Sequence, residues 1–277
     1  MNFNGADFHV HSDFSDSSYS VEETLKKAKV LGIGAMSFTD HDHTETYAYA
    51  RPLAQALGIA LIPGVELSAY DFKRGRKVHL LGYHYREEAP HIRALGQEVL
   101  ESRNRTSHQQ LEKILAAGYP LDREALRPAR NQEKTLYKQH IMRALGQVEG
   151  ESPAYRALYK RLFKPGGLAY KEAHYVDVHR ALEAILADGG LAVLAHPGQL
   201  DSFDLAEDLV REGLGGIEVY HYAHSPQDEA RARALARDHG LLVTGGSDYH
   251  GTFGKNPQLG APKLREEEIQ ALVFKKR

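Results

Sequence analysis

The chain has 277 residues, a length within the range of one large α/β domain or of a barrel with an insertion. Lys and Arg number 35 against 37 Asp and Glu, so the formal net charge is -2 and no overall positive field draws the chain to nucleic acid or a membrane surface. The absence of cysteine excludes disulfide bonds and thiolate chemistry.

The N-terminal residues show no basic segment followed by an apolar one, which is the pattern of a secretion signal. No apolar run approaches the roughly 18 residues that a membrane helix needs. We therefore expect a soluble, cytoplasmic protein.

The segment DFHVHSD, which begins at Asp7, places two histidines one residue apart in an extended pattern. Successive side chains of a strand point to opposite faces, so His9 and His11 share one face while Phe8 and Val10 share the other. Neutral imidazole is the commonest metal ligand among side chains. The pattern predicts a pair of metal ligands above an apolar layer.

Strand and helix patterns alternate after this segment. Ser20 followed three residues later by Glu23 predicts the start of a helix, and Gly32 predicts its end. The next expected elements are a strand over residues 33–42, a helix over 46–58, and strands over 59–69 and 77–85. Strands separated by helices imply parallel pairing.

A charged helical pattern without a convincing strand extends from about residue 90 to 165, and the alternation then resumes. Such alternation over this length predicts a β/α barrel. We expect a barrel domain over residues 1–90 and 170–277, with a helical insertion over residues 91–169 that covers the barrel mouth.

His, Asp or Glu residues end or occupy one predicted strand after another. In a β/α barrel the functional residues lie at the C-terminal ends of the strands. Six such strand ends in succession favour a shared metal site over isolated, satisfied polar side chains. The residues are His9, His11, Asp40, His41, Glu66, His79, His196, Glu218, His221, Asp248 and His250.

Nitrogen and carboxylate ligands without sulfur suit Zn, Mn or Fe better than Ca or Mg. The candidates are more numerous than one ion can use, so the sequence predicts two or three divalent ions. Clustered ions of this kind clamp phosphoryl oxygens during an in-line displacement.

Seven segments of the chain resemble motifs of the PHP (polymerase and histidinol phosphatase) superfamily, and within it the TrpH-like phosphoesterases of the nucleoside 3',5'-bisphosphate phosphatase and ribonuclease AM type. They are FHVHSDFSD, FTDHD, GVELSA, VHLLGY, AVLAHPG, GIEVYH and GLLVTGGSDYHG, in the family's order from residue 8 to residue 251. The resemblance implies an α/β fold, a distorted seven-stranded (β/α) barrel with a helical insertion.

The resemblance also implies three sets of metal ligands. They are His9, His11, Glu66 and Asp248 for one ion, Glu66, His79 and His140 for a second, and Asp16, His41, His196 and His250 for a third. Two neighbours depart from the family pattern, because Gln139 stands where a proline usually precedes the histidine and Ser17 stands where a glycine usually follows the aspartate.

Three further residues are candidates for contact with the substrate. Arg103 and Arg105 are expected to bind phosphate, since guanidinium recognises phosphate bidentately; the alternative is a solvated, charged helix face. His224 is a candidate for contact with substrate and for protonation of the leaving group, and a metal-bound water is the alternative acid.

We therefore expect a phosphoester hydrolase in which a metal-bridging hydroxide attacks phosphorus. By resemblance, the substrate is the 5'-phosphate ester of a nucleotide, such as a nucleoside 3',5'-bisphosphate or AMP, or a short 5'-phosphorylated single-stranded RNA, and not duplex DNA. Two alternatives stay open: a histidinol-phosphate phosphatase and a non-catalytic, metal-stabilised binding module. The sequence leaves the oligomeric state open.

Overall fold

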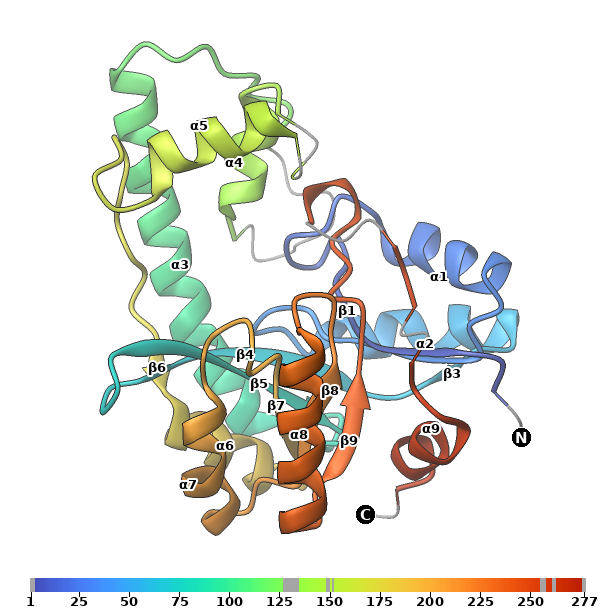
Figure 1. Ribbon diagram of the computed structural model, residues 1–277. Coiled ribbons are helices and arrows are strands. Elements are labelled where there is room, and N and C mark those ends of the chain that lie inside the picture. Colours follow the sequence, from blue (N-terminus) through green and yellow to red (C-terminus); the bar gives the residue numbers. More distant parts are fainter. Residues whose placement is uncertain are drawn as a thin grey trace.

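The computed structural model describes residues 3–126, 135–147, 150, 152–254, 258–260 and 263–275. They form an α/β fold in which helices surround the strands, as expected (Figure 1). The strands are β1 (Ala6–Val10), β2 (Ala35–Phe38), β3 (Ala60–Leu61), β4 (Gly64–Asp71), β5 (Arg76–Tyr83), β6 (Val176–Asp177), β7 (Leu191–Leu194), β8 (Gly216–Tyr220) and β9 (Leu242–Gly245).

The strands form two sheets. The smaller sheet has the order β1-β2-β3 and the larger one β6-β4-β5-β7-β8-β9. Isolated bridges join the sheets, one between Val10 and Tyr249 and one between His41 and Glu66. The expected seven-stranded barrel is not confirmed, because the described residues form nine strands in two sheets and no single closed ring.

β5 runs antiparallel to both of its neighbours, β4 and β7, whereas the sequence favoured parallel strands. The link from β4 to β5 is a short turn in which Asp71 accepts hydrogen bonds from the backbone of Arg74 and Gly75, and a turn this short joins only antiparallel strands. Glu66 pairs with Leu81 across the two strands, so His79 lies diagonally opposite Glu66.

Four helices begin after a Ser or Asp whose side chain accepts a hydrogen bond from the first turn. Ser20 accepts from the Glu23 N–H at 3.2 Å and Glu23 accepts from the Ser20 N–H at 2.8 Å, which confirms the predicted capping box. The helices are α1 (Val21–Val30), α2 (Glu45–Leu57), α3 (Pro90–Ala116), α4 (Lys138–Ala144), α5 (Pro153–Phe163), α6 (Val178–Ala187), α7 (Ala206–Arg211), α8 (Pro226–His239) and α9 (Glu266–Val273). The sequence pattern did not predict α9.

Apolar side chains fill the space between the sheets and between each sheet and its helices. Phe8, Leu81 and Val193 are fully buried where the two sheets meet, and Leu80 and Ile92 belong to the cluster between the larger sheet and its covering helices. Burial of each such side chain contributes roughly 1.5–3 kcal/mol. The core therefore fixes the strand ends that carry the polar residues described below.

The region predicted as a helical insertion packs around its own apolar cluster, which includes Ile114, Ile141, Leu162 and Phe163. The 27-residue helix α3 joins this cluster to the sheet, because its first half buries Ile92 against the main core. Figure 1 shows α3 extending past the strands toward α4 and α5.

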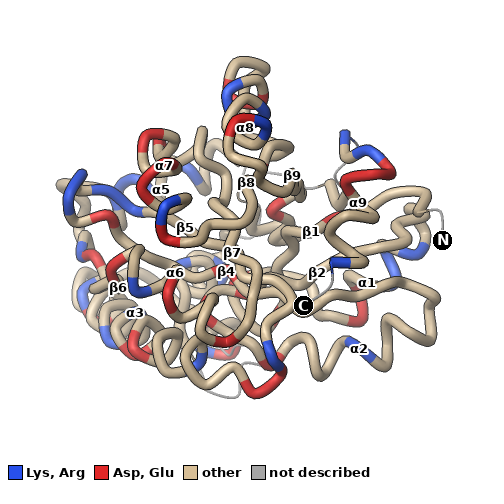
Figure 2. Tube along the Cα trace, turned by 90° about the horizontal axis from the view of Figure 1, so that it is seen from below, with Lys and Arg blue, Asp and Glu red and all other residues tan. Residues whose placement is uncertain are grey.

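Charged residues of both signs lie along the outer helices, for example on α3 and α8 (Figure 2). This mixture agrees with the near-zero net charge. No helix in the described ranges has both the length and the apolar character needed to cross a bilayer.

We predict that Gly246→Ala lowers the free energy of unfolding by about 1–3 kcal/mol, which is the usual cost of overpacking. A Cβ at Gly246 would lie 2.7 Å from the His9 Cα and closer to the His9 N and Cβ, so the backbone after β9 would have to move away from β1. Urea denaturation measures the effect. Gly5→Ala is the control, since nothing lies within 4 Å of a Cβ added there; equal stability of the two variants would contradict the prediction.

Candidate metal centre

β1 presents its side chains in the predicted alternation. Phe8 and Val10 are buried in apolar clusters, while His9 and His11 lie on the other side and make polar contacts. Both imidazoles have 0% exposure. The strand therefore delivers two buried nitrogen donors to one place.

Glu66, on β4, lies at the centre of the site. Its side chain is 1% exposed, and five imidazole nitrogens from separate parts of the chain lie within 3.3 Å of its two oxygens. On Oε2 the partners are His9 Nε2 at 3.3 Å, His11 Nε2 at 3.2 Å and His41 Nδ1 at 3.2 Å; on Oε1 they are His79 Nδ1 at 2.7 Å and His196 Nε2 at 2.9 Å.

Three groups of donors in the described residues have ligand atoms within 4.8 Å of one another. They are His9, His11, Glu66 and Asp248; His41, Glu66 and His79; and His11, Asp16, His41 and His250. The first group is the ligand set that the resemblance implied for one ion. The structure brings together nine of the ten predicted ligands, because His196 also contacts Glu66.

The donor atoms are better suited to binding divalent cations than to forming hydrogen bonds with one another. The buried atoms His9 Nε2, His11 Nε2, His41 Nδ1 and Asp16 Oδ1 have no hydrogen-bond partner in the described part of the chain, and such atoms are costly to bury. Two donors about 2.1 Å from one cation are about 3.0–3.4 Å apart. The 3.2 Å separations around Glu66 match that spacing.

Charge coupling dominates the pKa values in the metal-free site. Burial by itself raises the pKa of Glu66, but the surrounding imidazoles outweigh burial and lower it well below its usual value. Burial lowers the pKa of His11, and the carboxylates of Asp248 and Glu66, each 3.2 Å from its Nε2, reverse the effect and raise it to about 10. Glu66 and His11 therefore hold each other in charged forms, whereas burial lowers the pKa of His41 well below its usual value. A cation would replace the protons of the charged imidazoles.

Two other buried carboxylates that the sequence singled out lie behind the donors. Glu218 is 3.0 Å from His9 Nδ1 and accepts the backbone N–H of His196 at 2.8 Å. A carboxylate on the second ring nitrogen orients a ligating histidine. Asp40 accepts hydrogen bonds from Ser12, Ser15 and Thr46, so it orders the loop between β1 and α1.

Two residues of this site have strained backbone conformations. His196 and Asp248 have positive φ values of 25° and 51°, an arrangement that non-glycine residues adopt at a cost. Ser17 is not among the positive-φ residues, so the turn after Asp16 does not require the glycine that the family usually has there.

His140 does not reach the donor groups. Its Nδ1 is 3.3 Å from the backbone N of Tyr137, at the start of α4. The preceding residue occupies the position facing the site instead, since Gln139 donates to Asp16 Oδ2 at 2.8 Å. In the structure His196, rather than His140, accompanies His79 at Glu66 Oε1.

The two candidate arginines of α3 lie in different environments. Arg103 donates to Asp42 at 3.2 Å and to Ser68 at 2.8 Å, and it borders the cavity beside the donors. Arg105 is 70% exposed and pairs with Glu101 on its own helix. Arg103 therefore faces the site, whereas Arg105 has the alternative role of a solvated helix residue.

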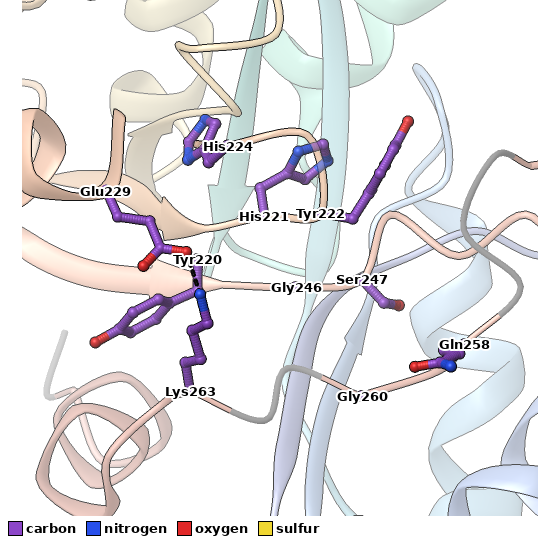
Figure 3. Close-up of a pocket in the computed structure, with 10 residues that line it drawn as sticks. All are labelled: Tyr220, His221, Tyr222, His224, Glu229, Gly246, Ser247, Gln258, Gly260 and Lys263. Atoms are coloured by element: carbon purple, nitrogen blue, oxygen red, sulfur yellow. Dashed lines mark hydrogen bonds and ion pairs between the residues drawn. The ribbon is translucent and has the colours of Figure 1, made fainter. Parts of the chain in front are cut away.

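His224 follows β8 and borders a cavity of about 240 Å³, with His221 beside it (Figure 3). Its Nδ1–H donates to the Val219 carbonyl at 2.8 Å, so its Nε2 accepts from the Gly198 N–H at 3.1 Å. Both ring nitrogens are bound to the backbone. This arrangement does not favour the predicted role in leaving-group protonation, because the imidazole has no free proton to donate.

Two cavities open from the donor groups. One of about 230 Å³ is lined by the donors Asp16, His41 and His79 and by the cationic residues Lys77, Arg103 and Lys138. A second, of about 570 Å³, begins at Asp248 and His250 and includes the rings of Tyr155, Tyr159, Tyr222 and Phe253. Neither Lys77 nor Lys138 stands out in the sequence, where the only signal is proximity to candidate histidines.

The PHP domain model matches residues 7–193 of the chain. The chain belongs to the PHP domain family. The matched range includes the donors His9, His11 and Glu66.

Related proteins align over almost the whole chain. Phosphoribosyl 1,2-cyclic phosphate 1,2-diphosphodiesterase of Eggerthella lenta is 48% identical over 254 residues, which cover 92% of this chain and 97% of the relative. The 3',5'-nucleoside bisphosphate phosphatase of Chromobacterium violaceum is 30% identical over 285 residues, covering 96% and 97%.

Among solved structures, a protein from Bifidobacterium adolescentis that is assigned as a metal-dependent phosphoesterase superposes with a TM-score of 0.86 at 25% identity. The superposition covers 99% of this chain and 97% of that one. The similarity therefore includes both the sheets and the helical region.

We predict that Lys138→Met raises the melting temperature of the metal-free protein at pH 7. Burial, together with the cations Lys77, Arg103 and Lys164, lowers the pKa of Lys138 from 10.5 to about 8. The charged lysine therefore costs stability fully below about pH 8, and the cost disappears as the pH rises toward 10.5.

Thermal unfolding at pH 7, 9 and 10.5 tests this prediction, with the exposed Lys113→Met on α3 as control. The gain of Lys138→Met should shrink as the pH rises, and the control should show no such trend. A gain that stays constant with pH would contradict it.

Proposed function

We propose that this protein is a metal-dependent phosphoesterase that acts on a small phosphorylated ribose, with a phosphoribosyl 1,2-cyclic phosphate as the first candidate. The extent of identity to the Eggerthella lenta diphosphodiesterase, 48% over 92% of this chain, supports this substrate class. Hydrolysis would form a bond from a water oxygen to phosphorus, break one P–O ester bond, and leave the proton of the water on the departing oxygen.

The cavity of about 230 Å³ carries the proposal. Its volume is below the roughly 300–1,000 Å³ of sites for drug-sized ligands, so a phosphorylated sugar is a better fit than a long chain. Its lining includes donors for divalent cations, Asp16, His41 and His79, and also Arg103. A phosphoryl group bound there would meet positive charge from the cations and from the guanidinium.

We assign three cation positions to the donors. His9, His11, Glu66 and Asp248 would hold one cation, Glu66, His79 and His196 a second, and Asp16, His41 and His250 a third. When bound, divalent cations supply positive charge to the phosphoryl oxygens and make water a stronger acid.

Arg103 is the group of the chain best placed to bind the phosphoryl oxygens. Asp42 and Ser68 hold its guanidinium, and the ring of Tyr137 lies 5.1 Å from it. A donor fixed before the reaction needs no reorganisation when charge develops, which is the condition for electrostatic stabilisation of a transition state. Its Nε is buried without a hydrogen bond among the described residues.

A nucleoside 3',5'-bisphosphate is the second candidate. The 570 Å³ cavity beside Asp248 offers tyrosine and phenylalanine rings on which a base can stack, and the Chromobacterium violaceum relative bears that activity in its name. We do not retain the non-catalytic module, because the named relatives are enzymes and the donor groups are present here.

A substrate panel tests the proposal. Phosphate or product release is measured with phosphoribosyl 1,2-cyclic phosphate, adenosine 3',5'-bisphosphate, a 5'-phosphorylated RNA pentamer and histidinol phosphate, with Mn²⁺ and after chelation. We expect the highest kcat/KM for the cyclic phosphate and loss of turnover on chelation. A preference for the nucleotide would select the second candidate, and turnover of histidinol phosphate alone would overturn both.

We predict that Arg103→Gln lowers kcat/KM at least about 100-fold, the loss typical of removing one donor to a transition-state oxyanion. Arg105→Gln, on the same helix, should stay within about threefold of wild type because that side chain is exposed. Steady-state kinetics with a melting-temperature check compares the two. Equal effects of the two substitutions would contradict the role of Arg103.

A further inference from the structure

Cationic side chains continue from the 230 Å³ cavity into a neighbouring cavity. This neighbouring cavity has a volume of about 420 Å³. It shares Lys77, Lys138 and Tyr159 with the 230 Å³ cavity. Lys164 borders the outer one. The two cavities are therefore neighbours, and the residues that they share include two lysines.

These cations differ in how far the protein neutralises them. Arg103 is paired with Asp42 at 3.2 Å, and Lys77 with Glu172 at 3.3 Å. Lys138 forms no ion pair with a carboxylate in the described ranges, and its Nζ lies 5.7 Å from the centre of the Phe163 ring. The protein thus keeps an uncompensated ammonium at the edge of a cavity, in an arrangement that an anion would complete.

The position of Lys138 is tied to the donor groups. The adjacent Gln139 donates to Asp16 Oδ2 at 2.8 Å, and consecutive Cα atoms are about 3.8 Å apart. Lys77 lies two residues before His79 on β5 and therefore on the same face of the strand. Lys77 is therefore on the strand that carries the donor His79, and Lys138 is next to a residue that contacts the donor Asp16.

We propose that Lys77 and Lys138 form a second anion subsite, which binds the phosphate group of the substrate that is not hydrolysed. This inference rests on the proposed function and narrows it, because it selects sugars that carry two phosphoryl groups. Lys138 is then a specificity-determining residue: it acts on binding of the distal phosphate, while Arg103 faces the ester that is cleaved.

Matched pairs of substrates test the subsite. Each pair shares one scissile ester and differs only in the second phosphate: phosphoribosyl 1,2-cyclic phosphate against ribose 1,2-cyclic phosphate, and adenosine 3',5'-bisphosphate against AMP. We expect Lys138→Met to raise KM about tenfold for the members with two phosphates, with kcat within about twofold of wild type and little change for the other members. Lys138→Arg should restore most of the difference, and Lys113→Met is the control.

Binding of ribose 5-phosphate to the metal-free protein, measured by calorimetry, separates the subsite from the reaction. Weaker binding of ribose 5-phosphate to Lys138→Met than to wild type supports the subsite. This result would stand even if the wild type cleaved no ester of the panel and the proposed function were wrong. Equal binding to both proteins, or an equal loss of activity on both members of each pair, would overturn the subsite.

Discussion

The burial of Glu66 is the constraint on which the rest of the structure depends. An isolated carboxylate is too costly to bury, and here five imidazoles offset that cost. Those imidazoles come from segments distant in sequence, so the site exists only when both sheets have formed. A bound cation would serve the same purpose more completely, because it would also use the buried atoms that have no hydrogen bond among the described residues.

The fold meets this constraint with short strands and close backbone contacts. β1 lies against Gly246, where a side chain would overlap His9. Single bridges at Val10 and His41 join the two sheets near the donors. The positive φ values of His196 and Asp248 cost free energy, and they let these residues at strand ends point toward the site. Packing of the surrounding core maintains the strained conformations.

Local patterns in the sequence were sufficient for much of this architecture. The alternation of β1, the capping box at Ser20 and Gly32 after the end of α1 each depend on residues close in the chain. Donor residues at successive strand ends were recognisable for the same reason, since each lies beside an apolar run. The prediction was therefore strongest where one segment carries the whole signal.

Tertiary contacts decided the rest. The reversal of β5 follows from the short turn at Asp71, and its consequence for His79 depends on register with β4. His224 has a backbone carbonyl and a backbone N–H as partners, and no sequence pattern specifies them. Arg103 and Arg105 are two residues apart, so only the packing of α3 distinguishes the one that faces the cavity. The lysines of the cavity lie on separate elements and converge only in the folded chain.

The most direct test of this account is anomalous X-ray diffraction from crystals of the Mn²⁺-loaded protein. The account predicts separate anomalous peaks beside the two oxygens of Glu66, each about 2.0–2.3 Å from a carboxylate oxygen and an imidazole nitrogen. Protein that binds Mn²⁺ with no peak at Glu66, or with peaks only at other carboxylates, would contradict the central role of this residue.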